Sequence, residues 1–207
     1  MMMANYQIPT SNFQGTWRRS SRLGGWVLVV GSCLVVGATA YAASAWRVSQ
    51  GDVRVMCPMT IGGSFDAKSS MVSGLLAANG THIDGTVSVD LKTLDTGISL
   101  RNEHMRDNYL EVGKGAGYDT AALSGIELKG VNGDAPDGKG SFTAMLTVHG
   151  TTKSVGGPVE VRKAGSGLRV KASFPVNLPD YNIPEPRYLG VGVKNTVQVD
   201  VTFTATQ

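Results

Sequence analysis

The sequence predicts an all-β fold built from antiparallel strands, either a barrel or a sandwich. First, apolar and polar residues alternate with a period of two over long stretches, which is the pattern of a strand with one buried face. Second, clusters of Gly, Asn, Asp and Pro separate these stretches. Third, only one segment combines helix-forming residues with helical spacing. Short strands with such turns and almost no helix are typical of closed or double-layered antiparallel folds.

Ahead of this fold, residues 1–45 have the order of an export signal. Three arginines within residues 18–22 precede an uncharged stretch whose most apolar part is residues 26–36. Small-residue A-x-A patterns follow, ending at Ala40, Ala42 and Ala45. Because an apolar centre of 11 residues falls short of the roughly 20 that span a membrane, we expect cleavage, with an uncleaved membrane anchor as the alternative. The domain predicted for residues 46–207 is then periplasmic or secreted, or anchored outside the cytoplasm with the N-terminal segment as its only membrane contact.

The charge distribution argues against one class of partner. The net charge of +3 comes from those arginines, since residues 46–207 carry 16 basic and 16 acidic side chains. A protein that binds the nucleic-acid backbone needs concentrated Lys and Arg, so no nucleic-acid partner is predicted. Cys57 is the single cysteine of residues 46–207, and we expect it to be a small buried hydrophobe without an internal disulfide.

The strand candidates differ in the clarity of their alternation. Weaker candidates occupy residues 53–56, 63–68, 71–76, 122–129 and 154–161. Clear alternation marks residues 86–91, 142–148, 168–178 and 196–205. Residues 182–187 contain two prolines and are expected to form a plain connection. The apolar side chains predicted to line the interior are Val87, Val89, Leu91, Phe142, Leu146, Val148, Val170, Phe174, Val199 and Phe203.

Residues 99–110 break the strand pattern. They contain helix formers after Ser99, which is expected to cap the helix, and Met105 and Tyr109 lie four residues apart on one face. A short helix across one end of the barrel accommodates this segment, with its apolar face over the opening and its charges toward water. The candidates at the mouth of a ligand site are Arg101, Met105 and Tyr109.

No constellation of residues indicates an enzyme. The three histidines lack the spacing of a metal site, and no G-x-S-x-G motif occurs. His82 is expected in a solvated loop, whereas His104 and His149 are expected to hold a helix or a hairpin through hydrogen bonds. We therefore predict no catalytic residue, no metal and no covalent cofactor. Titratable groups converging inside the barrel would instead favour an enzyme that acts on a lipid.

Three segments carry motifs that occur together in a known family. They are Leu94-Asp95-Thr96-Gly97 with Arg101-Asn102-Glu103-His104-Met105, then Leu146-Thr147-Val148-His149-Gly150-Thr151-Thr152-Lys153-Ser154-Val155, then Asp180-Tyr181-Asn182-Ile183. These resemble the segments S-[IL]-D-T-G-N-x-x-R-D-x-H-[LM], L-T-L-H-G-V-T-K-P-V and D-F-G-I of the YceI-like family of exported lipid- and polyisoprenoid-binding proteins. The resemblance covers residues 46–205. The chain departs from the family at residues 56–65, which replace the usual H-S-x-[IV]-x-F strand, and at Ser154, where proline is common.

The resemblance implies a lipocalin-like antiparallel barrel of eight strands with one or two short helices. It also implies a bound amphiphile whose isoprenoid or acyl tail lies in the interior, such as an isoprenoid quinone, a polyprenyl lipid or a fatty amide. The residues alone leave a hollow and a filled interior open, because an eight-stranded barrel is near the size that side chains can fill. A filled barrel would suit a non-enzymatic interaction or stress-response module that binds another exported protein through its loops. Both alternatives leave a monomer and a homodimer open.

Overall fold

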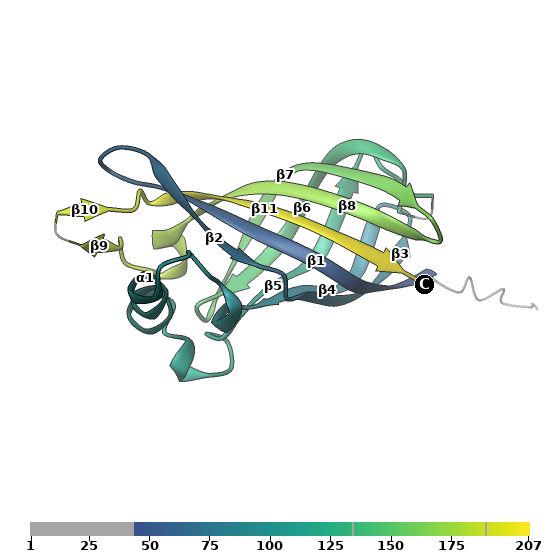
Figure 1. The fold of residues 1–207 in the computed structure, drawn as a ribbon. Helices are drawn as coiled ribbons and strands as arrows, with labels where there is room; N and C mark the ends of the chain where they lie inside the picture. The colour runs from purple at the N-terminus through teal and green to yellow at the C-terminus, as the bar shows by residue number, and fades with distance from the viewer. Residues whose placement is uncertain (1–43, 134, 189) are drawn as a thin grey trace, which may run out of the picture. The chain divides into compact units, whose positions relative to one another are not determined.

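Eight antiparallel strands form a closed barrel in the computed structural model, which describes residues 44–133, 135–188 and 190–207. Around the barrel they follow as β1 (Ser44–Pro58), β3 (Val72–Asn79), β4 (His82–Asp90), β5 (Thr120–Lys129), β6 (Gly138–Val148), β7 (Thr151–Ala164), β8 (Gly167–Asn177) and β11 (Thr196–Thr206) (Figure 1). The pairing of β11 with β1 closes the barrel. This architecture confirms the predicted fold class. All but the last two residues of the predicted targeting segment, residues 1–45, lie outside the described residues.

Strand β1 is longer than predicted and borders three other strands. One of its edges pairs with β11, while its other edge pairs first with β3 and then with the short strand β2 (Ser64–Ser69). The change of partner lies near Gly51, where an added Cβ would stand 2.6 Å from the Cβ of Val72. A glycine is needed here because any side chain would push the adjacent strand away.

The predicted alternation has the phase that the barrel requires. On β6, Phe142, Leu146 and Val148 are buried, and their polar neighbours lie on the outer face. Leu91 is also buried, but it is not part of a strand as predicted. It begins the 3-10 turn η1 (Leu91–Thr93), because the Asp90 carboxylate accepts a hydrogen bond from the Lys92 amide at 2.9 Å and turns the chain.

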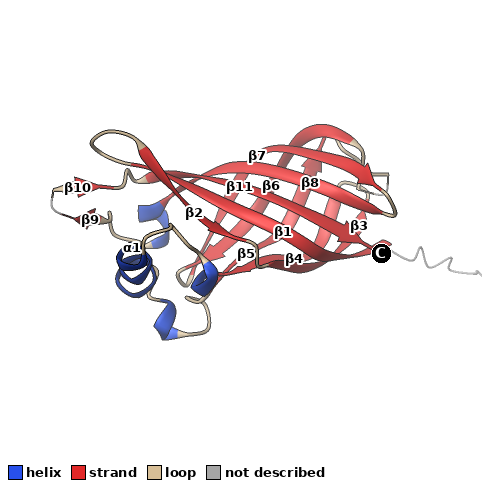
Figure 2. Ribbon diagram, viewed as in Figure 1, coloured by secondary structure: helices blue, strands red, loops and turns tan. Residues whose placement is uncertain are grey.

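One end of the barrel carries the helical segments (Figure 2). The predicted helix is present as α1 (Ser99–Glu103), continues as the π-helical turn η2 (His104–Tyr109) and is followed by the 3-10 turn η3 (Val112–Lys114). The expectation for Ser99 is wrong, because Ile98 is the capping residue and no side chain caps the helix there. Asn102 holds this end instead, since its Oδ1 accepts hydrogen bonds from the amide and hydroxyl of Thr96 at 2.8 and 2.7 Å.

The connection expected at residues 182–187 is more structured than predicted. The 3-10 turn η4 (Leu178–Tyr181) precedes it, and a small hairpin of β9 (Arg187–Tyr188) and β10 (Val191–Gly192) follows. The hairpin is tied to the end of β1, because the Thr60 amide donates to the Gly192 carbonyl at 2.8 Å. Within the described residues, no helix combines the length and the apolar character needed to cross a membrane.

Candidate ligand-binding cavity

The barrel interior is hollow toward the end that carries the helices. A cavity of about 450 Å³, which we call the mouth chamber, lies inside strands β1, β4, β5, β6, β8 and β11 and reaches α1 and the β9–β10 hairpin. This volume falls within the range of roughly 300–1,000 Å³ that is typical of small-molecule sites. Val55 and Val199 face each other across the β1–β11 pairing, line the chamber and are only partly buried. Inward-facing valines keep accessible surface here because they border open space.

The predicted interior residues divide between two cavities. A second cavity of about 100 Å³ lies toward the opposite end of the barrel, where Gly133 and Pro136 of the β5–β6 connection line it; we call it the closed-end chamber. The mouth chamber is lined by Val87, Val89, Leu91, Leu146, Val148, Phe174 and Val199. The closed-end chamber is lined by Phe142, Val170 and Phe203, and also by Val87. Their role in binding a ligand stays a prediction.

The three predicted mouth residues all line the mouth chamber. The guanidinium carbon of Arg101 lies 4.2 Å from the centre of the Phe65 ring, a cation–π distance. Tyr109 joins the helical segment to the hairpin, because its hydroxyl donates to the Arg187 carbonyl at 3.2 Å and accepts from the Arg187 amide at 3.1 Å. Met105 packs against the core beside it.

The expectation that the helix charges face water is wrong for two of them. Arg101 covers Phe65 at the chamber wall, and the Nη2 of Arg106 donates to the Leu94 carbonyl at 2.5 Å. Both side chains reach back toward the barrel because the long stem of an arginine can pack along apolar surface. Glu103 and Asp107 are exposed as expected.

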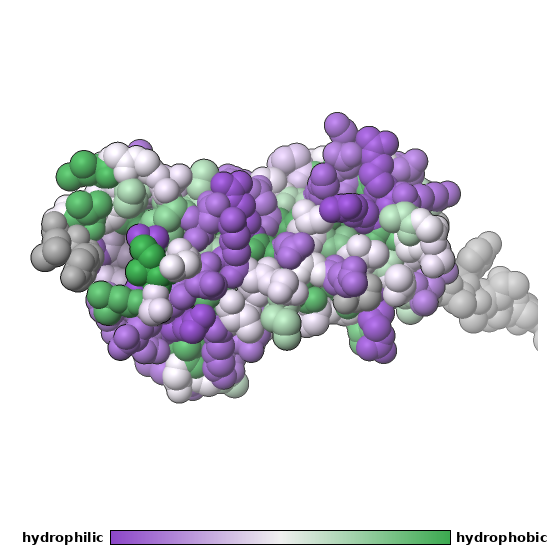
Figure 3. Space-filling view, viewed as in Figure 1, coloured by the Kyte–Doolittle hydropathy of each residue, from purple (hydrophilic) through white to green (hydrophobic). Residues whose placement is uncertain are grey.

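Sequence reasoning missed the contribution of the hairpin. Val191 and Val193 line the mouth chamber together with Pro186. Val191, Ile98 and Leu100 also border the opening with exposed fractions of 37%, 49% and 51%. Figure 3 shows hydrophobic surface at this end of the molecule. The only sequence signal was a short apolar alternation after a proline-rich segment, too brief to predict a strand.

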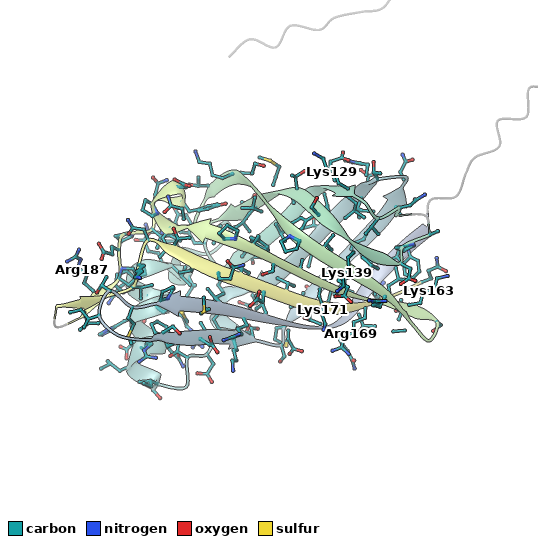
Figure 4. All side chains as sticks on the ribbon, turned by 90° about the horizontal axis from the view of Figure 1, so that it is seen from above. Lys129, Lys139, Lys163, Arg169, Lys171 and Arg187 are labelled. Carbon is teal, nitrogen blue, oxygen red and sulfur yellow. The ribbon has the colours of Figure 1, made fainter. Side chains whose placement is uncertain are left out.

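In the described part of the chain, the ionisable side chains that line the interior lie along the mouth chamber. Among the described residues that line either chamber, the ionisable ones are Cys57, Arg101, His104, Tyr109 and Arg187, and all of them border the mouth chamber. Other basic side chains, such as Lys139 and Lys171, lie on the outside of the barrel, far from Arg187 (Figure 4). The described residues contain no cluster of three side chains able to hold a metal ion.

Cys57 has the environment of a small hydrophobe. It lines the mouth chamber, and its thiol lies 3.7 Å from the Val55 carbonyl oxygen. Burial is the main cause that raises the pKa of this thiol to about 11, with a further increase from the Asp66 carboxylate. A thiol with such a pKa is protonated near neutral pH and is a poor nucleophile.

The histidines have structural surroundings. His149 is buried in a left-handed conformation between β6 and β7; its Nδ1 lies 2.9 Å from the Tyr181 carbonyl oxygen and its Nε2 lies 2.9 Å from the Glu111 carboxylate. It thereby links the β6–β7 turn to η3 and η4, as expected for a hydrogen-bonding residue. His82 begins β4 rather than lying in a loop, and it is exposed between Glu127 and Asp84.

The polar residues of the first motif hold the helical segment on the barrel. Asp95 exchanges backbone hydrogen bonds with Lys68 of β2, both at 2.8 Å. Its carboxylate accepts from the Asn102 side chain at 2.6 Å and from the Gly97 amide at 2.8 Å. These two bonds, the Asn102 bond foremost, lower the pKa of Asp95. Asp95 therefore joins β2 to α1 and fixes the helix across the mouth.

Comparisons with known proteins agree with this architecture. A family model of the YceI-like domain matches residues 42–205. The fold is similar to a polyisoprenoid-binding domain of Saccharophagus degradans implicated in plant cell wall breakdown, with 17% identity and a TM-score of 0.61 over 78% of this chain and 97% of that chain. It is also similar to BcnA of Burkholderia cenocepacia, with 18% identity and a TM-score of 0.58 over 74% of this chain and 96% of that chain. A YceI protein of Campylobacter jejuni has 13% identity and a TM-score of 0.51 over 66% and 81% of the two chains. No match was found among the curated proteins.

Proposed function

The chain belongs to the YceI-like family, and on this basis we propose that it is a non-enzymatic binding protein that holds the apolar tail of an amphiphile in the mouth chamber. The observation that carries the proposal is the cavity of about 450 Å³, which is lined almost entirely by apolar side chains and opens beside the helices. Such a preformed apolar cavity is the usual form of a small-molecule site.

The energetics of burial favour a long tail. Each methylene transferred from water into the chamber contributes about 0.8 kcal/mol, so about ten methylenes contribute about 8 kcal/mol before the costs of association are subtracted. Affinity should therefore rise by about fourfold for each methylene added, until the chamber is full.

The position of the polar groups supports an amphiphile rather than a hydrocarbon. Arg101, His104 and Arg187 border the chamber at its mouth, where a polar head would lie once the tail is inside. Isoprenoid quinones, polyprenyl lipids and fatty amides all combine such a head with a long tail. The similarity to a polyisoprenoid-binding domain, a likeness of fold, favours the isoprenoid class among them.

The chemistry of the lining supports binding without catalysis. Among the described residues, no Ser, Thr, Asp or Glu lines either chamber, and the lining thiol of Cys57 has a raised pKa. The one histidine of that lining, His104, therefore has no Ser, Thr or carboxylate in the lining to activate. A hydrolytic or proton-transfer site needs a nucleophile or a general base within hydrogen-bonding reach of the substrate. The proposed ligand would therefore leave the protein unchanged.

Export completes the proposal, with residues 1–45 either removed or retained as a membrane anchor. Strand β1 begins at Ser44, so cleavage after Ala40 or Ala42 would leave the whole strand in the mature protein, whereas cleavage after Ala45 would shorten it by two residues. Fractionation of cells followed by mass spectrometry of the mature N-terminus tests this. Recovery of the uncut chain from the cytoplasm would contradict export.

The direct test is extraction of the native ligand. Protein purified without detergent should release a stoichiometric long-chain species into organic solvent, identified by mass spectrometry. In a variant with Ala121→Phe, the larger side chain fills part of the mouth chamber, and the yield should fall. A variant with Thr147→Asp changes the outer face of β6 and should retain the ligand. Repeated recovery of no ligand, together with a partner protein that remains bound after delipidation, would favour the interaction module instead.

A further inference from the structure

The barrel contains a second apolar space that the mouth residues do not reach. The closed-end chamber, of about 100 Å³, has a lining of apolar side chains, with the indole of Trp46 as the single side chain that carries a polar atom among its described lining residues. Three residues, Val87, Leu123 and Val201, line both chambers, so the two spaces adjoin each other. The boundary between the two chambers therefore lies at the level of these residues.

Two aromatic rings lie at this boundary. Phe174 of β8 lines the mouth chamber and Phe142 of β6 lines the closed-end chamber. Their ring centres are 5.7 Å apart at an angle of 82°, an edge-to-face contact. Both side chains are buried, with exposed fractions of 2% for Phe174 and 4% for Phe142.

The register of β7 explains how rings from two non-adjacent strands can meet. The inward position of β7 between them is Gly157, which pairs with Phe142. A Cβ on Gly157 would stand 2.0 Å from the Ser173 carbonyl oxygen and 3.4 Å from the Cα of Phe174. Because this position has no side chain, the rings of Phe142 and Phe174 make contact across β7.

Strands β8 and β11 show the same division between the two chambers. Along β8, Val176 and Phe174 line the mouth chamber, whereas Ala172 and Val170 line the closed-end chamber. Along β11, Val201 marks the change, because residues before it line the mouth chamber and residues after it line the closed-end chamber. On β11 the lining residues reach four positions from Val201 in each direction, to Val197 and to Ala205, about 13 Å along the strand.

We propose that the Phe142–Phe174 pair is a divider that sets the length of the tail this protein accepts. With the rings in contact, the tail ends in the mouth chamber; without one ring, the two chambers join and a longer tail enters. This inference rests on the proposed binding function, and it assigns the length selectivity of the site to two residues distant from the mouth.

A chain-length series tests the divider. The affinities of straight-chain fatty alcohols of increasing length are measured by displacement of a fluorescent probe. For the unaltered protein, affinity should rise about fourfold per methylene and then level off. With Phe174→Ala or Phe142→Ala, the plateau should begin at a longer chain, and the preference for chains two methylenes beyond the original plateau should increase by about tenfold or more.

Two matched variants separate the divider from a general loosening of the core. Phe203→Ala enlarges the closed-end chamber but leaves the ring pair intact, so the plateau should stay at the original length. Phe174→Leu removes the ring with a smaller loss of volume, and it should lengthen the plateau even if Phe174→Ala does not fold. An unchanged plateau in every folded variant of the pair, or an equal change with Phe203→Ala, would overturn the inference.

Xenon binding in crystals gives a test that needs no tail. Dry apolar cavities take up xenon, so the unaltered protein should show separate xenon sites on the two sides of the ring pair, and Phe174→Leu should show density continuous between them. If no chain of any length binds, the proposed function fails, and the xenon positions still decide the divider. A single continuous xenon site in the unaltered protein would refute it.

Discussion

Replacement of Val201 by Asp would test whether the barrel interior is dry. Val201 is buried at the boundary of the two chambers, and its partners on the neighbouring strands are Val53 and Ala172. Loss of the buried Val costs about 1.5–3 kcal/mol. An Asp surrounded by apolar groups has its pKa raised by about 3–5 units, so at pH 7 its ionised form in the unfolded chain adds about 4 kcal/mol to the cost of folding. The sum of about 6 kcal/mol is comparable to the whole stability of a small domain.

The pH dependence distinguishes this cause from poor packing. Because the folded-state pKa of the introduced carboxyl group would lie above its unfolded value, the added cost is absent below about pH 4 and grows as the pH rises toward the folded-state pKa. Urea unfolding at several pH values should therefore show that the deficit of Val201→Asp is largest near neutrality. Thr202→Asp on the outer face is the control and should lose less than about 1 kcal/mol, as surface changes usually do. Equal, pH-independent losses in both variants would mean that water reaches the interior and that the apolar-tail site is wrong.

Three further predictions concern residues around the mouth. The pKa of Cys57 is raised to about 11, so iodoacetamide should label this thiol on the order of 100-fold more slowly at pH 8 in the folded than in the unfolded protein. Peptide mapping follows the labelling, and equal rates in the two states would contradict the burial of the thiol. His149→Asn keeps a residue that tolerates the left-handed backbone but loses the hydrogen bonds to Tyr181 and Glu111. The free energy of unfolding, measured in urea, should therefore fall by about 2 kcal/mol, and an unchanged midpoint would argue against the structural role of His149. Because the pKa of Asp95 is lowered in the folded state, its contribution to stability is present above about pH 4 and is lost as the pH falls through the folded-state pKa. Asp95→Asn should therefore lose less stability on acidification than the unaltered protein. Parallel curves of unfolding free energy against pH for the two proteins would refute this.

The strands were predictable because their pattern depends on one local property. Residues such as Phe203 and Ala205 alternate with polar neighbours, and any strand with one face in a barrel interior must show that alternation. Strand β1 was only partly predicted, since the residues before Val53 include Gly51 and polar residues and do not alternate clearly. Its place depends on pairing with β3 and β11, which lie far away in the sequence.

The hollow interior was not predictable from any single strand. Whether an inward position is filled depends on the sizes of side chains that other strands bring to the same level of the barrel. At one level, Phe142 and Phe174 meet over Gly157, whereas the paired Val199 and Val55 border the open space of the mouth chamber. These neighbours follow from register, and register is a property of the closed barrel rather than of the local sequence.

The polar and the apolar residues of the family motifs have different roles, and this explains why the motifs identify the fold better than the ligand. Their polar members, Asp95, Asn102 and His149, make the hydrogen bonds that hold the helical segment and the β6–β7 turn in place. Such bonds require particular side chains at particular positions, and this is what makes a motif recognisable in a sequence. The cavity wall requires only apolar side chains of suitable size, which many substitutions satisfy. Differences in the accepted tail between members of the fold should therefore arise at inward positions outside the motifs, such as Phe174 at the inner end of the mouth chamber.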